Sequence, residues 1–179
     1  ENIIQNRSTM KTTILLSVFM VTMSSYELHH SEIDSKQKLG LQMLDALRQS
    51  SSDAFSAAIP TLEEFHRLME QIQFLYGENL QMAKADLEQQ YHESVLPAIR
   101  RSFRNVISQG QKAAIDWSNI KLVSVEVGAE PRADFDVLPV TIVFASKKEQ
   151  YRIQIDKALV IGGQWRISQF MRLEKLIPR

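Results

Sequence analysis

The chain has 179 residues, of which 44% are hydrophobic and 23% charged, so it has ordinary globular composition and enough length for one buried core. Its formal net charge is zero, and without an overall positive field we expect no nucleic-acid partner. It contains no cysteine, which excludes disulfides, thiolate nucleophiles and cysteine-based zinc sites, so packing must supply the stability.

Residues 10–25 have the three parts of a secretory signal. The basic residue Lys11 follows Met10, an apolar run of about ten residues begins at Ile14, and the small residues Ser24 and Ser25 end it. The run is shorter than the roughly 20 apolar residues that a membrane helix needs. We therefore predict a signal peptide cleaved near Ser24 or Ser25, with an uncleaved anchor and a buried strand as alternatives. Export to the periplasm or the cell exterior follows, with no stable membrane span after cleavage.

The segments on either side of the signal are polar. Residues 1–9 precede a methionine that would be a natural start, so we interpret them as upstream translated sequence or sequence added for expression. Residues 26–35 are predicted to be a polar linker. No repeat, low-complexity tract or long linker interrupts residues 36–179, which we predict to form a single domain.

Apolar residues with helical spacing predict the first helices. Residues 39–47 present one amphipathic face, and the serines at 50–52 end it. Thr61 and Glu64 have the spacing of a capping box, in which each side chain accepts a hydrogen bond from the other's backbone amide. A second helix is therefore predicted to begin there and to continue until Gly77.

A third helical run begins near Glu78 and continues to Ile107. Pro97 lacks an amide hydrogen, so it either kinks this run or opens a new helix in its first turn. We interpret Gly110 as loosening the stretch that follows. Residues 116–119 mark the end of the helical period.

From Ile120 onward the apolar period falls from about 3.6 to 2, which indicates half-buried strands. The alternation predicts four strands, over residues 122–127, 138–145, 151–156 and 165–168. The three connections, at residues 130–134, 146–149 and 162–163, are too short for crossover helices. The sheet is therefore predicted to be antiparallel, and helices followed by strands give an α+β fold.

This order of elements, with Trp117 at the helix-to-strand junction and Gly-Gly-Gln-Trp-Arg-Ile at residues 162–167, resembles the nuclear transport factor 2-like, or cystatin-like, superfamily. It is most similar to small exported bacterial members of unassigned function, one group of which also resembles residues 53–65. The resemblance covers residues 39–170 and implies helices packed on the concave face of a curved four-stranded sheet. Because the superfamily hosts isomerases, dehydratases, hydrolases, transport factors and accessory domains, it implies little about function.

Enzymes of this superfamily place acids, histidines or tyrosines on the inner face of the sheet, where burial adjusts their pKa. Here the inward alternation is almost wholly aliphatic, and its exceptions are Tyr151 and Trp165, each an apolar body with one polar edge. With Tyr76 and Trp117 they are the candidate ligand-binding residues. Ordinary core packing is the other interpretation of these side chains.

Charged residues of the strands are predicted to lie on the opposite, solvated face and to form cross-strand ion pairs. These residues are Glu126, Arg152, Asp156 and Arg166. Glu63 and His66 form a single Glu-x-x-His pair, whereas a di-iron bundle needs two, so no metal site is expected.

These observations favour an exported, non-catalytic module that binds a small apolar ligand or a protein partner, with no catalytic residue, cofactor or metal. The alternative is a small enzyme of the isomerase or hydrolase type with its pocket in the hollow of the sheet. Its candidate residues are Asp134, Asp136 and Tyr151. A third possibility is a subunit that forms a homodimer through the open face of the sheet.

Overall fold

The computed structural model of the chain describes residues 35–71, 79–128 and 137–177. Contacts between α-carbons divide the chain into two units, Glu1–Asp34 and Ser35–Arg179, and the described residues all belong to the second.

Several predictions therefore fall outside the described residues. These are the signal peptide, the linker as far as residue 34, and the candidate residues Tyr76, Asp134 and Asp136. Within the described ranges, no helix combines the length and the apolar character needed to cross a membrane.

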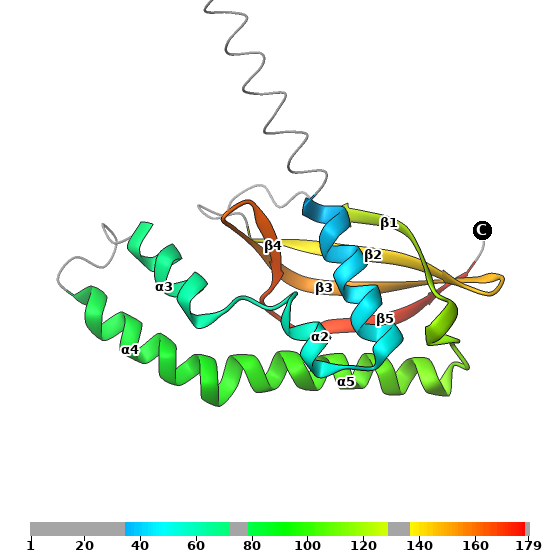
Figure 1. The fold of residues 1–179 in the computed structure, drawn as a ribbon, viewed down its shortest axis with the longest axis horizontal. Helices are drawn as coiled ribbons and strands as arrows, with labels where there is room; N and C mark the ends of the chain where they lie inside the picture. Colours follow the sequence, from blue (N-terminus) through cyan, green and yellow to red (C-terminus); the bar gives the residue numbers. More distant parts are fainter. Residues whose placement is uncertain (1–34, 72–78, 129–136, 178–179) are drawn as a thin grey trace, which may run out of the picture. The chain divides into compact units, whose positions relative to one another are not determined.

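Helices come first in this unit (Figure 1). They are a helix over residues 35–49, α2 Ser52–Ser56, α3 Leu62–Gln71, α4 Leu80–Gln90, a π-helical turn η3 Tyr91–Val95, and α5 Leu96–Lys112. The first helix ends at the predicted serines, where Ser50 has a φ of 48° and the Ser51 amide donates to the Ala46 carbonyl. The predicted capping box also forms, because the Glu64 amide donates to Thr61 Oγ1 and the Thr61 amide to Glu64 Oε2.

Pro97 is accommodated by the π-helical turn in front of it. A proline ring normally collides with the carbonyl one turn earlier in an α-helix. Here Pro97 lies in the first turn of α5, and the Leu96 amide donates to the Tyr91 carbonyl, five residues back. The predicted change at Pro97 thus takes the form of one wide turn, and α4, η3 and α5 follow one another without a break (Figure 1).

An antiparallel sheet follows the helices. Its strands are β1 Lys121–Val127, β2 Val137–Ser146, β3 Glu149–Ile161, β4 Gln164–Ile167 and β5 Met171–Leu176. The strand order is β1-β2-β3-β4, and β5 pairs with β3. All pairings are antiparallel, which confirms the predicted α+β fold of helices followed by an antiparallel sheet. The four predicted strands are present, and β5 is an addition to them.

Strand β3 is long enough to pair with two strands along one edge. Its first part, Gln150–Ile155, pairs with β5, and its last part, Ala158–Ile161, pairs with β4. Strand β2 pairs with the other edge of β3, and register shifts in the β1–β2 and β2–β3 ladders mark bulges. Bulges bend strands and increase their twist, so the sheet curls around the helices.

One hydrophobic core joins the helices to the inner face of the sheet. Its side chains with at most 2% exposure include Leu39, Met43, Leu44, Leu47, Phe55, Ile99, Phe103, Ile142, Phe144, Ile153 and Ile155. Phe55 of α2 stacks on Phe103 of α5 with ring centroids 4.1 Å apart. Helix side chains therefore fill the inner face of the sheet.

Gly110 does not loosen the chain as predicted; it is a buried residue inside α5. A Cβ atom built on Gly110 would lie 1.9 Å from Cζ2 of Trp117. Trp117 belongs to a short 3₁₀ helix, η4 Trp117–Asn119, at the predicted junction between helices and sheet. The missing side chain of Gly110 thus allows the indole to lie against the helix backbone.

Candidate functional site

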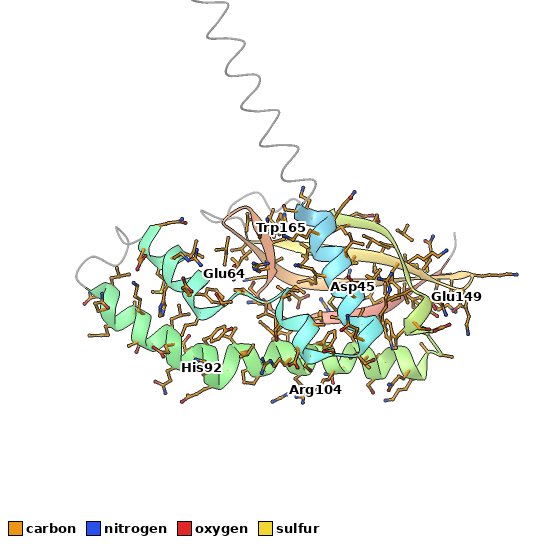
Figure 2. All side chains as sticks on the ribbon, in the orientation of Figure 1. Asp45, Glu64, His92, Arg104, Glu149 and Trp165 are labelled. Atoms are coloured by element: carbon orange, nitrogen blue, oxygen red, sulfur yellow. The ribbon has the colours of Figure 1, made fainter. Side chains whose placement is uncertain are left out.

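The three candidate ligand residues that the structure describes are all buried, with exposures of 8% for Trp117, 3% for Tyr151 and 2% for Trp165. The ring of Phe144 lies between Trp117 and Tyr151, with centroid distances of 5.9 and 5.6 Å. These two candidates therefore share one aromatic group. Trp165 is far from them, because it pairs with Val160 near the end of β3, whereas Tyr151 lies near its start. Figure 2 shows Trp165 on β4, well apart from Glu149, the first residue of β3.

The polar edges of these side chains are not directed at a shared site. The Tyr151 hydroxyl donates to Glu149 Oε2, and this hydrogen bond together with burial raises the pKa of Tyr151. The indole nitrogens of Trp117 and Trp165 are buried and have no hydrogen-bond partner in the described part of the chain. The three residues thus serve mainly in packing.

Two pockets open elsewhere in the described structure, and none of the predicted ligand residues lines either one. The larger pocket, of about 580 Å³, is lined by Arg48, Asp116, Ser118, Asn119, Ile120, Lys121, Ala145 and Lys147. The smaller, of about 230 Å³, is lined by Ser94, Val95, Ala98, Ile99, Ser168, Gln169 and Phe170. We call them the polar pocket and the apolar pocket.

The apolar pocket lies between the long helix and the link from β4 to β5. Val95, Ala98 and Ile99 have i, i+3 and i+4 spacing, so they share one helix face across the join of η3 and α5. Phe170 comes from the link and is 56% exposed, and it lines the pocket together with this helix face. The exposed ring and the apolar helix face next to it thus form one continuous apolar surface, the kind of surface that marks interaction sites.

Hydrogen bonds hold the link in place beside the pocket. The amide and the hydroxyl of Ser168 both donate to the Lys157 carbonyl, at 3.1 and 3.0 Å. The Phe170 carbonyl accepts a hydrogen bond from the Asp156 amide at 3.0 Å. The link is thereby fixed to β3 at two points, so this wall of the pocket is already formed without a ligand.

The other wall is fixed through the π-helical turn. The Tyr91 hydroxyl donates to the Pro60 carbonyl at 2.9 Å, and its ring meets Phe65 edge-on at 5.9 Å. Burial raises the pKa of Tyr91, so its hydroxyl stays protonated and available as the donor at neutral pH. Tyr91 therefore ties the wide turn to the segment that precedes α3.

Arg166 corrects one expectation about the strand charges. Its side chain is only 18% exposed; Nη2 lies 2.8 Å from Glu64 Oε1, and Nη1 donates to the Ala57 carbonyl at 3.2 Å. It thus connects β4 to Glu64 of α3, which Figure 2 labels, instead of lying on a solvated face. Burial raises the pKa of Glu64, but the hydrogen bonds from Arg166 and Thr61 outweigh it and leave this pKa lowered.

Two other members of the charged set behave as predicted. Arg152 pairs with Glu174 at 2.6 Å, and Asp156 pairs with Arg172 at 2.7 Å. Both pairs join β3 to β5 and are substantially exposed, so each contributes at most about 1 kcal/mol. They keep this part of the outer face polar.

The titratable groups that line the pockets suit binding better than proton transfer. Asp116 is the carboxylate among the lining residues, and its oxygens accept hydrogen bonds from Ser118 Oγ and Asn119 Nδ2, which lower its pKa. It is therefore ionised at neutral pH and is a poor general acid. In the described ranges, no three His, Asp or Glu residues come together in a way that could hold a metal ion.

Comparison with known proteins places this chain in no family. No family model matches it, and no curated protein matches it. Among solved structures, it is similar to a cystatin-like protein from Ruminococcus gnavus ATCC 29149, with 9% sequence identity and a TM-score of 0.46. That similarity covers 86% of this chain and 48% of the other, so this chain spans about half the length of that protein.

Proposed function

We propose that this chain is a non-catalytic binding module of an exported protein, and that its apolar pocket receives one apolar side chain of a protein partner. The order of helices and strands is consistent with a place in the nuclear transport factor 2-like, cystatin-like superfamily. Export itself is proposed from the signal-like residues 10–25.

The proposal rests on the pocket formed by Val95, Ala98, Ile99 and the exposed Phe170. Its volume of about 230 Å³ is below the range of about 300–1,000 Å³ for pockets that hold drug-sized ligands. An engineered cavity of about 150 Å³ holds a single benzene ring, so this pocket suits one large side chain. Interfaces commonly depend on one such anchor in a preformed pocket with a polar rim.

The polar rim is also suited to a peptide. Ser94, Ser168 and Gln169 line the pocket beside its apolar wall and can exchange hydrogen bonds with a partner's backbone. The Ser168 hydroxyl already donates to the Lys157 carbonyl but can still accept a hydrogen bond. A purely apolar small ligand would form no hydrogen bond with any of the three groups. A protein partner is therefore favoured over a free apolar molecule.

The enzyme alternative has weaker support. Its pocket was expected in the hollow of the sheet, but the stacked rings of Phe55 and Phe103 and other core side chains occupy that hollow. Its candidate Tyr151 is 3% exposed and already bonded to Glu149.

The pocket is tested with N-acetyl-leucine amide and N-acetyl-phenylalanine amide, each of which presents one apolar side chain between two peptide groups. Burying such a side chain contributes about 1.5–3 kcal/mol, so dissociation constants of about 10 mM or weaker are expected. Amide resonances of residues 94–99 and 168–170 should shift on titration, as measured by NMR. N-acetyl-glutamine amide is the matched polar probe and should leave them unchanged.

Two variants distinguish binding in the pocket from a general effect of an added leucine on the helix. Ala98→Leu fills the pocket and should abolish the shifts, whereas Asn105→Leu adds the same side chain at an exposed position of α5 and should leave them intact. If neither apolar probe shifts these resonances at about 50 mM, or if Ala98→Leu binds as well as the native chain, the proposed function is wrong. Mass analysis of the exported chain tests the signal separately, since cleavage should leave an amino terminus near Ser24.

A further inference from the structure

The polar pocket lies at a different place, where the carboxyl end of the helix over residues 35–49 meets η4 and the turn between β2 and β3. Three cationic side chains line it: Arg48, Lys121 and Lys147. They come from three separate segments of the chain, so the fold brings them together. Asp116 is the one carboxylate among the lining residues, and Asp45, outside the lining, pairs with Arg48. The small excess of positive charge therefore comes from the two lysines.

Arg48 is held in position by the backbone it faces. Its Nη2 donates to the Ile120 carbonyl at 2.8 Å, and its Nη1 lies 2.5 Å from Asp45 Oδ1. The Arg48 side chain is 35% exposed and thus remains accessible to solvent in the pocket. A guanidinium fixed in this way presents its remaining N–H donors without a further loss of side-chain freedom.

The acids near the two lysines already have other partners. Asp116 accepts hydrogen bonds from Ser118 and Asn119, and Glu149 accepts them from Lys175 and Tyr151. Lys147 lies near enough to Asp116 and Glu149 to lower the pKa of both. Among the described residues, however, neither Lys121 nor Lys147 makes an ion pair within 4.0 Å.

Lys147 also has an unusual backbone conformation for its residue type. Its φ is 58°, in the left-handed region that favours glycine. The turn between β3 and β4 meets the same need in the ordinary way, with Gly162 and Gly163 at φ values of 57° and 73°. Ser50 and Ala114 have similar φ values of 48° and 54°, so this conformation is not specific to the pocket. It does mean that glycine can replace Lys147 without backbone strain.

We propose that the polar pocket binds a small organic anion that carries two or more carboxylate or phosphate groups. Two anionic groups match the ammonium groups of Lys121 and Lys147, and the remaining N–H donors of Arg48 can add hydrogen bonds. The volume of about 580 Å³ lies within the range of pockets that hold small-molecule ligands. This site is independent of the apolar pocket, since the two have no lining residue in common.

The test is isothermal titration calorimetry at low salt with two probes, citrate and inorganic pyrophosphate, and with uncharged glucose as the control. Binding by either anion, with no heat from glucose, is expected, and the stronger of the two identifies carboxylate or phosphate as the preferred group. Lys121→Gln and Lys147→Gln should each weaken binding about fivefold, the effect of one ion pair in a water-filled pocket. Lys148→Gln removes the same charge from the same turn, outside the lining, and should change the affinity less than twofold.

Lys147→Gly distinguishes loss of the positive charge from loss of stability, because it removes the ammonium group while glycine adopts a φ of 58° without strain. This variant should unfold at a temperature no lower than the native chain and still lose affinity about fivefold. The inference is overturned if neither anion binds at about 10 mM, or if Lys148→Gln weakens binding as much as Lys147→Gln. In the second case the binding would be a diffuse charge effect and not the property of a site.

Discussion

Replacing Gly110 with alanine tests the closest contact in the core. The new Cβ would lie 1.9 Å from Cζ2 of Trp117 and 2.7 Å from Cε2 and Cη2. An ordinary contact begins near 3.4 Å, so the indole or the helix must move by about 1.5 Å. The indole is rigid, is 8% exposed and meets Phe144 at 5.9 Å, so it has little room to withdraw.

Two opposing effects set the magnitude. Alanine is favoured over glycine inside a helix by about 1 kcal/mol. Overpacking a close-packed core costs about 1–3 kcal/mol, and a collision with a rigid ring belongs at the upper end of that range. The free energy of unfolding should therefore fall by about 2 kcal/mol, which corresponds to a decrease in Tm of about 4–8 °C for a unit of this size.

Urea denaturation followed by circular dichroism measures this change, with Gly40→Ala as the matched control. At Gly40 the new Cβ would meet Cγ2 of Val125 at 2.6 Å and the methyl groups of Leu122 at 3.2 and 3.3 Å. This overlap is smaller than the one at Gly110, so a smaller loss is expected. In a Trp117→Phe background, which removes the outer ring of the indole, the cost of Gly110→Ala should shrink. A Gly110→Ala variant as stable as the native chain would refute the reasoning.

Two further predictions concern the contacts that hold α3 and the π-helical turn. Glu64 has a lowered pKa in the folded state, so its pairing with Arg166 stabilises the fold above the unfolded pKa of about 4.3 and is lost as pH falls through the folded value. Glu64→Gln should therefore cost about 1–3 kcal/mol at pH 7 and progressively less below pH 4.3, as measured by urea denaturation; a difference independent of pH would contradict this. Tyr91→Phe removes the donor to the Pro60 carbonyl and should cost about 1–2 kcal/mol in the same measurement, and an unchanged midpoint would show that this hydrogen bond does not hold the turn.

Local signals predicted most of the fold. The capping box at Thr61 and the glycines at 162–163 act over a few residues, and the structure has both. Strand β5 was missed because only Met171 and Leu173 of it contribute to the core, so its apolar alternation is weak. Its position depends on pairing with the distant first part of β3, and no local pattern specifies such a partner.

The pockets were missed for a related reason. In the sequence, Val95 and Ala98 belong to an ordinary apolar helix face. Phe170 is about 70 residues away along the chain and lies beside them only in the folded structure. Pro97 was the one local sign of irregular geometry there. For Trp165 the sequence left ligand binding and core packing open, because it could not show that helix side chains cover the inner face of the sheet, where Trp165 is 2% exposed.

The filled core also accounts for where the pockets occur. Regular helices and strands pack their side chains against each other, and here that packing leaves the inner face of the sheet closed. Both pockets open where regular structure is interrupted, one between the π-helical turn η3 and the β4–β5 link, the other between η4 and the β2–β3 turn. Ile99 and Ile120 line the pockets but also belong to the core. The exposed lining residues Ser94, Ser118 and Lys147 can change with little effect on it, whereas the buried Tyr151 and Trp165 cannot. Binding residues commonly lie on loops and turns held by a rigid scaffold, and the places of these two pockets follow that rule.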